Sequence, residues 1–341
     1  MKKAGMALRL AASKLSGQQI PFQVTFEVTD VCNLSCEYCL FKHEESRRTM
    51  FDSKRALRLV EEMAAAGTVK VNLSGGEPLL HPAIDEIVAA IRGFGIDCFL
   101  NTNGKLIDRH LKTVEKLSCL NISLDGDKPA HEAARGKGSH EYAIKALRTA
   151  KEMAIPRLMT AVIGKHNLDQ IDYLVSTARA LDAGIVILCL IKPRGTEGSV
   201  YAIPEEEGRR LFIDIAQRKS RGEPFVYSAA SMKVLQEWPL HLGTDHVLLR
   251  DKHLITGKTV PCYAGRYYCA VYADGTMSPC CISKGFVKNE PNVYDMSFQE
   301  AFARIREHGC YACNVPSVVD MNLLFSLHPV AIKNALSVYR F

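Results

Sequence analysis

A repeated alternation of short β-branched runs with longer helical patterns, over residues 23–191, constrains the fold most. Such a rhythm is typical of a parallel α/β sheet covered by helices. An open Rossmann-type sheet and a partial barrel both fit it, and in either fold the C-terminal ends of the strands carry the chemistry. The expected strands are Gln23–Thr29, Val69–Leu73, Ile96–Asn101, Leu120–Leu124, Arg157–Ile163 and Ile185–Ile191. The expected helices between them are Ser53–Ala66, Ala83–Phe94, Leu106–Leu117, His140–Met153 and Leu168–Leu181.

The composition is that of a globular protein. Hydrophobic residues make up 47% of the 341 residues and charged residues 23%, which excludes a disordered or low-complexity chain. No stretch approaches the roughly 18 apolar residues of a membrane span. The net charge of +6 is too small to indicate a nucleic-acid partner, so none is expected.

The first 20 residues begin like a signal peptide, but Arg9 and Lys14 interrupt the apolar run. We therefore expect an amphipathic surface helix there and a cytoplasmic protein. A cytoplasmic chain keeps its thiols reduced, so the clustering among its 12 cysteines points to metal or redox chemistry rather than disulfides.

Three cysteines directly follow the first expected strand. Cys32, Cys36 and Cys39 are separated by three and then two residues, a spacing that lets one loop wrap a compact inorganic core. Structural zinc takes four ligands, whereas three thiolates on a four-iron cluster leave one iron open for a substrate or cofactor. An iron–sulfur site is favoured over zinc and over a purely structural role.

Polar, glycine-containing loops follow the next three expected strands. They are Ser74–Pro78 (sequence SGGEP), Asn101–Gly104 (NTNG) and Ser123–Gly126 (SLDG). Each alone is compatible with an ordinary turn. Together they place backbone-exposing loops along one rim of the sheet, which turn statistics do not require.

The motif CxxxCxΦC at Cys32–Cys39, with Tyr38 as the aromatic residue, and the GGEP-type motif at Ser74–Pro78 resemble those of the radical S-adenosylmethionine (radical SAM) superfamily. The resemblance covers residues 20–195 and implies a partial (β/α)6 TIM-like barrel. It implies that the three cysteines hold a [4Fe-4S] cluster whose fourth iron binds SAM. It also implies reductive cleavage of SAM to a 5′-deoxyadenosyl radical, which takes a hydrogen atom from an unactivated C–H bond.

The same resemblance suggests contacts to SAM. The backbone of Gly75 and Gly76, together with Glu77, would receive its amino group, and the backbone of Tyr38 its adenine. Ser123 and Arg135 resemble the residues that contact the SAM carboxylate or ribose in members with an SLDG…RG stretch.

A second group of cysteines lies between positions 262 and 313. Asp274-Gly275-Thr276 predicts a hairpin turn that brings Cys262 and Cys280 together, and Cys310-Tyr-Ala-Cys313 adds two further thiols. Four cysteines fit zinc and iron–sulfur equally well. The arrangement resembles the Twitch module, a short form of the SPASM extension, which implies an auxiliary [4Fe-4S] cluster on Cys262, Cys280, Cys310 and Cys313. Cys269 and Cys281 are surplus, and since neighbours in a strand point to opposite sides, only one of Cys280 and Cys281 should be a ligand.

The expected organisation is an N-terminal helix (1–20), the barrel (21–225), a cysteine-rich β-hairpin and helix module (226–320) and a helical tail (321–341). Residues from about 257 to 316 show little helical periodicity. The terminal segments are compatible with peripheral membrane contact, although packing on their own domain is favoured.

Within this family, the sequence favours a small or lipid-like substrate oxidised with the help of the auxiliary cluster, because about 20 residues before the barrel leave no room for a leader-binding domain. The alternatives are a ribosomal-peptide maturase that cross-links or epimerises its substrate and, in another class, an iron–sulfur protein that only transfers electrons or senses redox state. A flavodoxin- or ferredoxin-like electron donor is expected for the enzyme.

Overall fold

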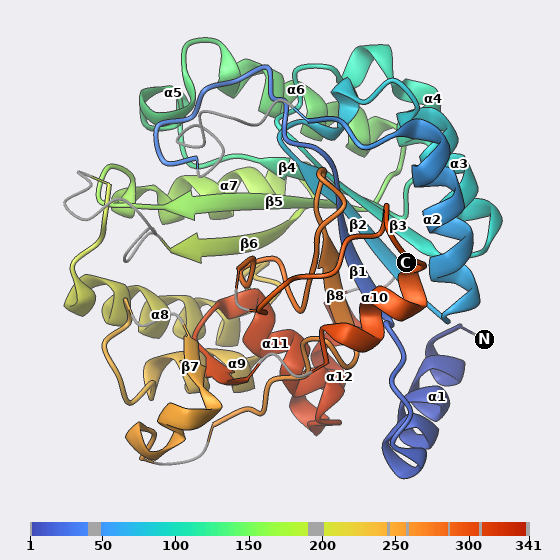
Figure 1. Cartoon of the computed structure of the whole chain (residues 1–341). Coiled ribbons are helices and arrows are strands. Elements are labelled where there is room, and N and C mark those ends of the chain that lie inside the picture. The colour runs from blue at the N-terminus through green and yellow to red at the C-terminus, as the bar shows by residue number, and fades with distance from the viewer. Residues whose placement is uncertain are drawn as a thin grey trace.

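The computed structural model describes residues 2–39, 49–189, 201–243, 246–256, 259–285, 287–306 and 309–338. Its main feature is an eight-stranded sheet with the order β6-β5-β4-β3-β2-β1-β8-β9 (Figure 1). No helix in these ranges is long and apolar enough to cross a bilayer. The strands are β1 (Gln23–Thr29), β2 (Lys70–Gly75), β3 (Asp97–Thr102), β4 (Cys119–Ser123), β5 (Arg157–Ile163), β6 (Gly184–Cys189), β8 (Tyr268–Val271) and β9 (Met277–Ser278).

The order of the first six strands decides between the two folds that fit the sequence. β1 to β6 are parallel neighbours in chain order, whereas a Rossmann-type sheet reverses its order at a switch point. Because each crossover is right-handed and runs in the same direction, the connecting helices gather on one face of the sheet. This is the arrangement of a partial barrel, so the predicted α/β class is confirmed. The end of the last predicted strand, residues 190 and 191, lies outside the described residues.

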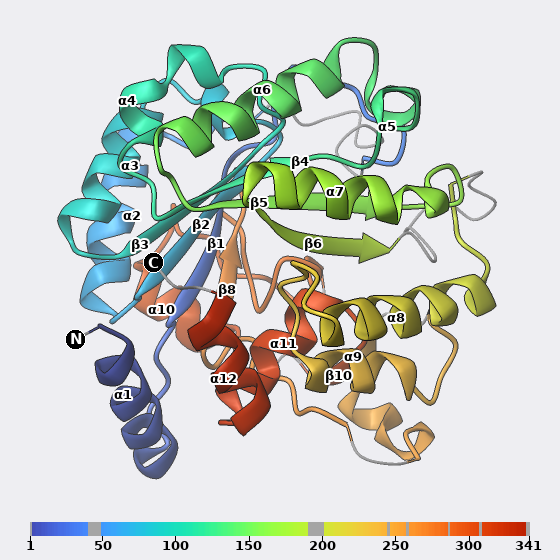
Figure 2. The same ribbon diagram turned by 180° about the vertical axis from the view of Figure 1, so that it is seen from behind.

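The helices that follow β1 to β5 cover the outer face of this sheet (Figure 2). Each buries one apolar stripe; in α2, for example, Ala56, Leu59, Val60 and Met63 are fully buried. Burying a large aliphatic side chain contributes roughly 1.5–3 kcal/mol, so such stripes fix the helices to the strands. The helices of this half are α1 (Lys2–Ser16), α2 (Ser53–Ala65), α3 (Ile84–Gly93), α4 (Leu111–Val114), α5 (Lys128–Arg135), α6 (Ser139–Glu152) and α7 (Ile171–Leu181).

Local side-chain bonds explain where helices differ from expectation. The predicted helix 106–117 is broken into a 3-10 turn, Ile107–Arg109, and the short α4, where His110 and Thr113 both bond to Asp85 of α3. α5 was not expected; it begins at Asp127, whose side chain accepts the N–H of Ala130 at 3.0 Å.

The C-terminal half contributes to the same sheet. β8 pairs in parallel with β1, in register Gln23↔Tyr268, and β9 returns antiparallel to it through a turn at Gly275, where φ is +82°. The predicted hairpin is therefore confirmed. The remaining elements are α8 (Glu205–Ser220), α9 (Ala229–Gln236), β7 (His246–Leu248), the 3-10 helix Leu249–Leu254, α10 (Phe298–Arg304), β10 (Cys310–Cys313), α11 (Pro316–Phe325) and α12 (Pro329–Val338).

The helix expected beside the hairpin of the cysteine-rich module is found as α10, although residues 257–316 show little helical periodicity. This helix starts with a capping box, in which Ser297 and Glu300 each bond to the other's backbone N–H. Seven residues are too few to show a helical period in the sequence.

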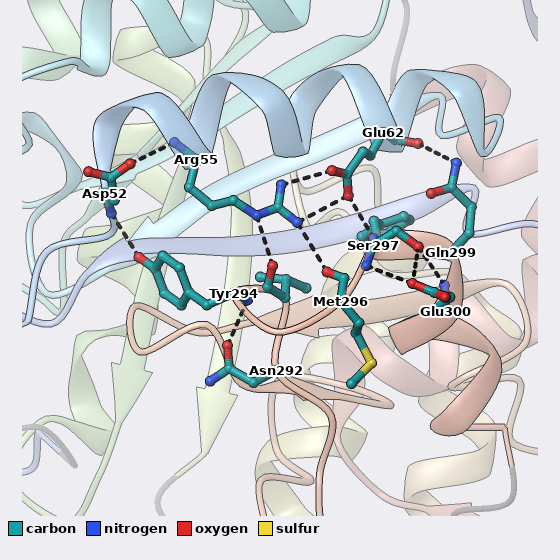
Figure 3. A network of polar contacts seen from close by, with 11 residues as sticks. Asp52, Arg55, Glu62, Asn292, Tyr294, Met296, Ser297, Gln299 and Glu300 are labelled. Carbon is teal, nitrogen blue, oxygen red and sulfur yellow. Dashed lines mark hydrogen bonds and ion pairs between the residues drawn. The ribbon is translucent and has the colours of Figure 1, made fainter.

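One polar network joins α2 of the barrel to the segment that leads into α10 (Figure 3). The Arg55 guanidinium donates to the carbonyl of Val293 at 2.8 Å and forms a two-pronged ion pair with Glu62 at 3.0 and 3.1 Å. Glu62 in turn accepts the N–H of Phe298 at 2.6 Å. The network is largely shielded from water, which makes its bonds stronger than those of a surface pair.

We expect Arg55→Met to lower the free energy of unfolding by about 2–4 kcal/mol, because it removes several bonds and leaves Glu62 half-buried without its counter-charge. Urea unfolding under anaerobic conditions measures the change. Arg58→Met, on the exposed side of the same helix, is the control and should change stability by under about 0.5 kcal/mol. Equal losses in both variants would show that the network adds nothing to stability.

Candidate functional site

The cysteine loop is held at the C-terminal end of β1 by backbone contacts. Thr29 ends the strand, and its hydroxyl accepts the N–H of Val31 at 3.0 Å. The N–H of Cys39 bonds to the carbonyl of Cys36 at 3.1 Å, closing a tight turn. Cys32 is exposed, Cys39 is half-buried and Cys36 is buried.

The three thiols are close enough to influence one another's ionisation. Burial raises the pKa of Cys36 to about 11, Arg135 opposes this, and the thiols of Cys39 and Cys32 add to the rise. Burial also raises the pKa of Cys32, with a contribution from Cys39. Mutual repulsion of thiolates is removed when they share a metal centre, so the loop fits a cluster ligated by all three.

The two glycines after β2 are required by close packing against this loop. A Cβ at Gly75 would lie 1.9 Å from the Thr29 carbonyl oxygen, and its φ of +130° also excludes most side chains. A Cβ at Gly76 would lie 2.3 Å from the Val31 carbonyl oxygen. The N–H of Gly76 donates to Thr29 at 2.7 Å. The glycines thus let the two loops touch, whereas their contact to the SAM amino group stays a prediction.

Glu77 joins the loops after β2 and β3. Its side chain is fully buried and accepts hydrogen bonds from the Thr102 hydroxyl and the Asn103 N–H, both at 2.9 Å, and from the Leu79 N–H at 3.2 Å. Asn103 then donates to the Asn33 side chain at 2.8 Å and lies 3.9 Å from the Cys32 sulfur. Glu77 therefore positions the cysteine loop through Asn103, a role that its sequence motif did not indicate.

The Glu77 carboxyl should make stability depend on pH, because burial raises its pKa from 4.5 to about 7. A carboxyl whose folded pKa is raised stabilises the protein when protonated. Its contribution is thus complete below pH 4.5, falls by about 3 kcal/mol as pH rises to 7, and is then constant. Urea unfolding at pH 5 to 8 measures the free energy of unfolding of the wild type and of Glu77→Gln, and the difference between the two isolates the contribution of Glu77. A difference that does not change with pH would contradict the prediction.

A buried ion pair underlies the aromatic residue of the motif. Asp125, after β4, is fully buried and binds Arg135 through two bonds of 2.5 and 3.1 Å. The Tyr38 hydroxyl donates to the same carboxylate at 2.5 Å, and the Arg135 guanidinium lies 5.5 Å from the Tyr38 ring centre. Burial alone would raise the pKa of Asp125, but Arg135 holds it below its usual value.

This network changes what can be expected of its members. The Arg135 side chain, predicted to contact SAM, is engaged by Asp125, which also accepts the N–H of Val162 at 2.9 Å. Asp125 therefore links the cysteine loop, α5 and β5. Sequence reasoning treated it only as a turn residue in SLDG. Ser123 lies half-buried at the end of β4, in register with Thr160 of β5.

The space beside Tyr38 contains an unused polar group. The His166 ring lies 6.3 Å from that of Tyr38, and both of its nitrogens are shielded from solvent with no hydrogen-bond partner within the described part of the chain. Such an orphaned group beside the cysteine loop fits a polar cofactor such as SAM. His166 carried no signal in the sequence.

The four cysteines expected in the C-terminal half do come together. The thiols of Cys262 and Cys310 are hydrogen-bonded, and this bond lowers the pKa of Cys262. Cys280 and Cys313 act electrostatically on Cys310 and also on Tyr268 between them. Cys280 follows β9, and Cys310 and Cys313 are the first and last residues of β10, so together with the segment of Cys262 three separate segments supply the group.

The two surplus cysteines differ from these four. Cys269 lies in β8 with its side chain in the hydrophobic core, and burial is the one cause that raises its pKa. Cys281 is exposed, whereas its neighbour Cys280 is buried; both lie in the bend and turn after β9, so the expected alternation along a strand is not what separates them. Within the described ranges, no three Cys, His, Asp or Glu side chains converge as on a single metal ion. The ligands of both clusters therefore remain predictions from spacing and proximity.

A comparison with family models settles the class of the barrel. Residues 26–178, from β1 to α7, match the model described as the radical SAM superfamily. These residues form a radical SAM domain. Its cofactors are thus a [4Fe-4S] cluster and SAM, and when bound the cluster supplies the electron that cleaves SAM.

Curated relatives include a cyclase, a maturase and a synthase. GTP 3′,8-cyclase of Chlorobaculum tepidum is 32% identical over 185 residues, which cover 52% of this chain and 55% of that protein. Mycofactocin maturase MftC of Mycolicibacterium smegmatis is 25% identical over 288 residues, 80% of this chain and 67% of that protein. AdoMet-dependent heme synthase of Methanosarcina barkeri is 24% identical over 301 residues, which cover 84% of this chain and 85% of that protein.

A solved structure supports the fold of the radical SAM chain as a whole. SuiB of Streptococcus suis bound to S-adenosylmethionine superposes with a TM-score of 0.68, covering 87% of this chain and 70% of that one at 18% identity. The similarity extends beyond the barrel into the C-terminal half, since the barrel alone would account for less of the chain.

Proposed function

We propose that this radical SAM enzyme modifies a peptide, with an auxiliary [4Fe-4S] cluster on Cys262, Cys280, Cys310 and Cys313. The observation that carries the proposal is the match to MftC over 288 residues, 80% of this chain, which is longer than the barrel alone. PqqA peptide cyclase is a further relative, named for a peptide substrate, and the sporulation killing factor maturation protein SkfB is another relative named for maturation. These relatives support the peptide alternative better than the small or lipid-like substrate that the sequence favoured.

The inner face of the sheet supports a polar substrate. Half-buried amide and hydroxyl groups form a row across four strands, opposite the helix-covered face. Asn101 donates to Ser74 at 3.3 Å, Asn121 donates to Asn101 at 2.9 Å, and Thr160 donates to Asn121 at 2.8 Å. A lipid chain placed against this row would bury the donors and acceptors that these bonds leave unused, which is unfavourable.

The row also matches the chemistry of a peptide group. A carboxamide has two N–H donors and can accept two hydrogen bonds, and the bonds above use one of each in Asn121. One donor and one acceptor remain, which is what a backbone C=O and N–H require. Asn121 is the middle residue of β4, two residues before Ser123 at the C-terminal end of the strand.

The auxiliary cluster would then act as an electron acceptor. Four protein thiolates leave it no open iron, so it transfers an electron but binds no substrate. This suits a reaction with net oxidation, such as forming a cross-link in the peptide. The electron donor, a flavodoxin- or ferredoxin-like protein, the cytoplasmic location and a peripheral membrane contact remain predictions.

The proposal is tested by anaerobic incubation with SAM, dithionite and synthetic peptides that correspond to the short reading frames flanking the gene. Mass spectrometry should find one peptide that loses two hydrogens, with 5′-deoxyadenosine formed alongside. No change in any of these peptides, with SAM still cleaved, would count against a peptide substrate.

A tetrapyrrole is the second candidate, because the match to heme synthase has the fullest mutual coverage of the relatives above. Fe-coproporphyrin III therefore belongs in the same assay as a competing substrate. Its oxidation, with all peptides unchanged, would favour this candidate. SAM cleavage in the absence of any acceptor separates an enzyme from an electron carrier.

Asn121→Leu should reduce peptide modification about 10- to 100-fold, because it removes one or two hydrogen bonds to the substrate amide. SAM cleavage without peptide should stay within about twofold of the wild type. Asn334→Leu is the matched control. Asn334 lies on α12, away from the row, and its amide donates to the Val226 carbonyl at 2.7 Å. An unchanged rate for Asn121→Leu would refute the role of the row.

A further inference from the structure

The sulfur of Cys262 lies among polar groups of the protein. It is hydrogen-bonded to the backbone N–H of Ala264, to the hydroxyl of Tyr268 at 3.7 Å and to the side-chain amide of Asn322. The thiol of Cys262 is also a hydrogen-bonding partner of Cys310. Cys262 is thus a ligand of the group that polar side chains of the protein reach.

Asn322 is held in a fixed orientation. Its oxygen accepts the backbone N–H of Tyr263 and the hydroxyl of Tyr268, both at 3.0 Å. This leaves the amide NH₂ for the sulfur of Cys262. Asn322 is 1% exposed and lies on α11, where every other buried residue is apolar. A buried amide in such a helix is unfavourable unless it is fully bonded.

Tyr268 is fixed as firmly. It begins β8, is 3% exposed, and its ring stacks on Phe325 of α11 at 6.0 Å between centres. A cysteine that ligates iron carries no proton, so the hydroxyl and the amide can meet its sulfur only as donors. A hydrogen bond to a thiolate is stronger than one to a neutral carbonyl. The Tyr268 proton, which points to the Asn322 oxygen, is therefore shared with the sulfur of Cys262 when that sulfur is a thiolate.

We infer that Tyr268 and Asn322 are positioning residues that tune the auxiliary cluster through the thiolate of Cys262. Donors to a ligand sulfur stabilise the reduced cluster, which has the more negative charge, and so raise its reduction potential. The pair would make the cluster a better acceptor for an electron from the substrate. This inference rests on the auxiliary cluster of the proposed function and adds its control of potential.

The test is a potentiometric titration of the reconstituted holoenzyme, followed by EPR. Two reduction steps are expected in the wild type. Tyr268→Phe and Asn322→Leu should each shift one step to a more negative potential, and the double variant should shift it further. The other step, from the cluster on the barrel cysteines, should not move.

Matched controls separate tuning from a structural role. Tyr227→Phe and Asn334→Leu also remove buried polar groups, but these bond to the carbonyls of Ile187 and Val226. They should lower the melting temperature and leave both potentials unchanged. If a Tyr268 or Asn322 variant fails to fold, the remaining single variant still carries the test.

The outcomes distinguish the inference from the proposed function. Two clusters in every protein, with both potentials unchanged in Tyr268→Phe and Asn322→Leu, would overturn the inference alone. A wild type that contains about four iron atoms and shows one reduction step would overturn the auxiliary cluster and this inference with it.

Discussion

Arg135→Met should lower the free energy of unfolding at pH 8 by about 3–5 kcal/mol, because it leaves the carboxylate of Asp125 buried without its counter-charge. Asp125 is fully buried, and Arg135 supplies two of its bonds. The remaining donors, the Tyr38 hydroxyl and the Val162 N–H, are neutral and compensate for only part of the charge.

The destabilisation should shrink on acidification. In the wild type, Arg135 holds the pKa of Asp125 below its usual value, so this pair stabilises the fold above about pH 4 and loses its effect as pH falls. Without Arg135, burial dominates and raises the pKa of Asp125, so the variant gains stability by protonation. The stability difference between the two proteins should therefore be smaller at pH 5 than at pH 8.

Chemical unfolding at pH 5, 6.5 and 8 measures this difference. Arg148→Met, an exposed arginine of α6, is the control and should match the wild type within about 0.5 kcal/mol. If Arg135 served only to contact SAM, Arg135→Met would unfold like the wild type at every pH and would weaken SAM binding. That result would exclude the structural role and restore the expectation from the sequence.

The strand alternation predicted the parallel sheet because its signal is local. Six short β-branched runs separated by helical segments suffice to identify βα units, and each is found in the structure. The choice of a barrel over an open sheet depends on the spatial order of the strands, which no segment encodes by itself. The same holds for β8, which pairs with β1 across more than 240 residues of sequence.

The cysteine groups were predictable for a similar reason, since spacing within a loop limits which thiols can share a centre. The roles of Glu77 and Arg135 were not. Each bonds to a partner that lies 10 to 26 residues away, on another strand or loop. Sequence motifs placed both residues at the rim of the barrel; their burial and bonds show in addition that they hold the cysteine loop, and their contacts to SAM stay predictions.

Asn322 shows the limit most clearly. One asparagine in an apolar helix near the C-terminus has no motif around it, and only the folded chain brings it to Cys262. A buried polar residue on an apolar helix is nevertheless a signal that can be sought in a sequence.

Cys36→Ala should abolish SAM cleavage, with 5′-deoxyadenosine formation falling at least 1,000-fold, on the order of 4 kcal/mol in barrier height. Cys36 is the buried member of the loop, and alanine removes one of three proposed ligands on a centre that already has one open site. Iron content should fall by about half, from roughly eight atoms per chain to four.

Cys280→Ala should have the complementary effect. It removes a ligand from the second cluster, so iron again falls by about half, whereas SAM is still cleaved and the peptide is no longer oxidised. Cys281→Ala, at the exposed neighbouring position, should retain full iron and turnover. Full product formation by Cys280→Ala would remove the auxiliary cluster from the reaction.

The two variants together separate the cysteine groups. Cys36→Ala should lose the barrel cluster and keep the auxiliary one, and Cys280→Ala should do the reverse. Cys119→Ala is the control for loss of a core thiol, since Cys119 is buried in β4 away from both groups. It should cost some stability and no iron. If Cys36→Ala and Cys280→Ala both lost all iron, the two cysteine groups would not be independent centres. The second group would then not be a separate closed cluster that only accepts an electron.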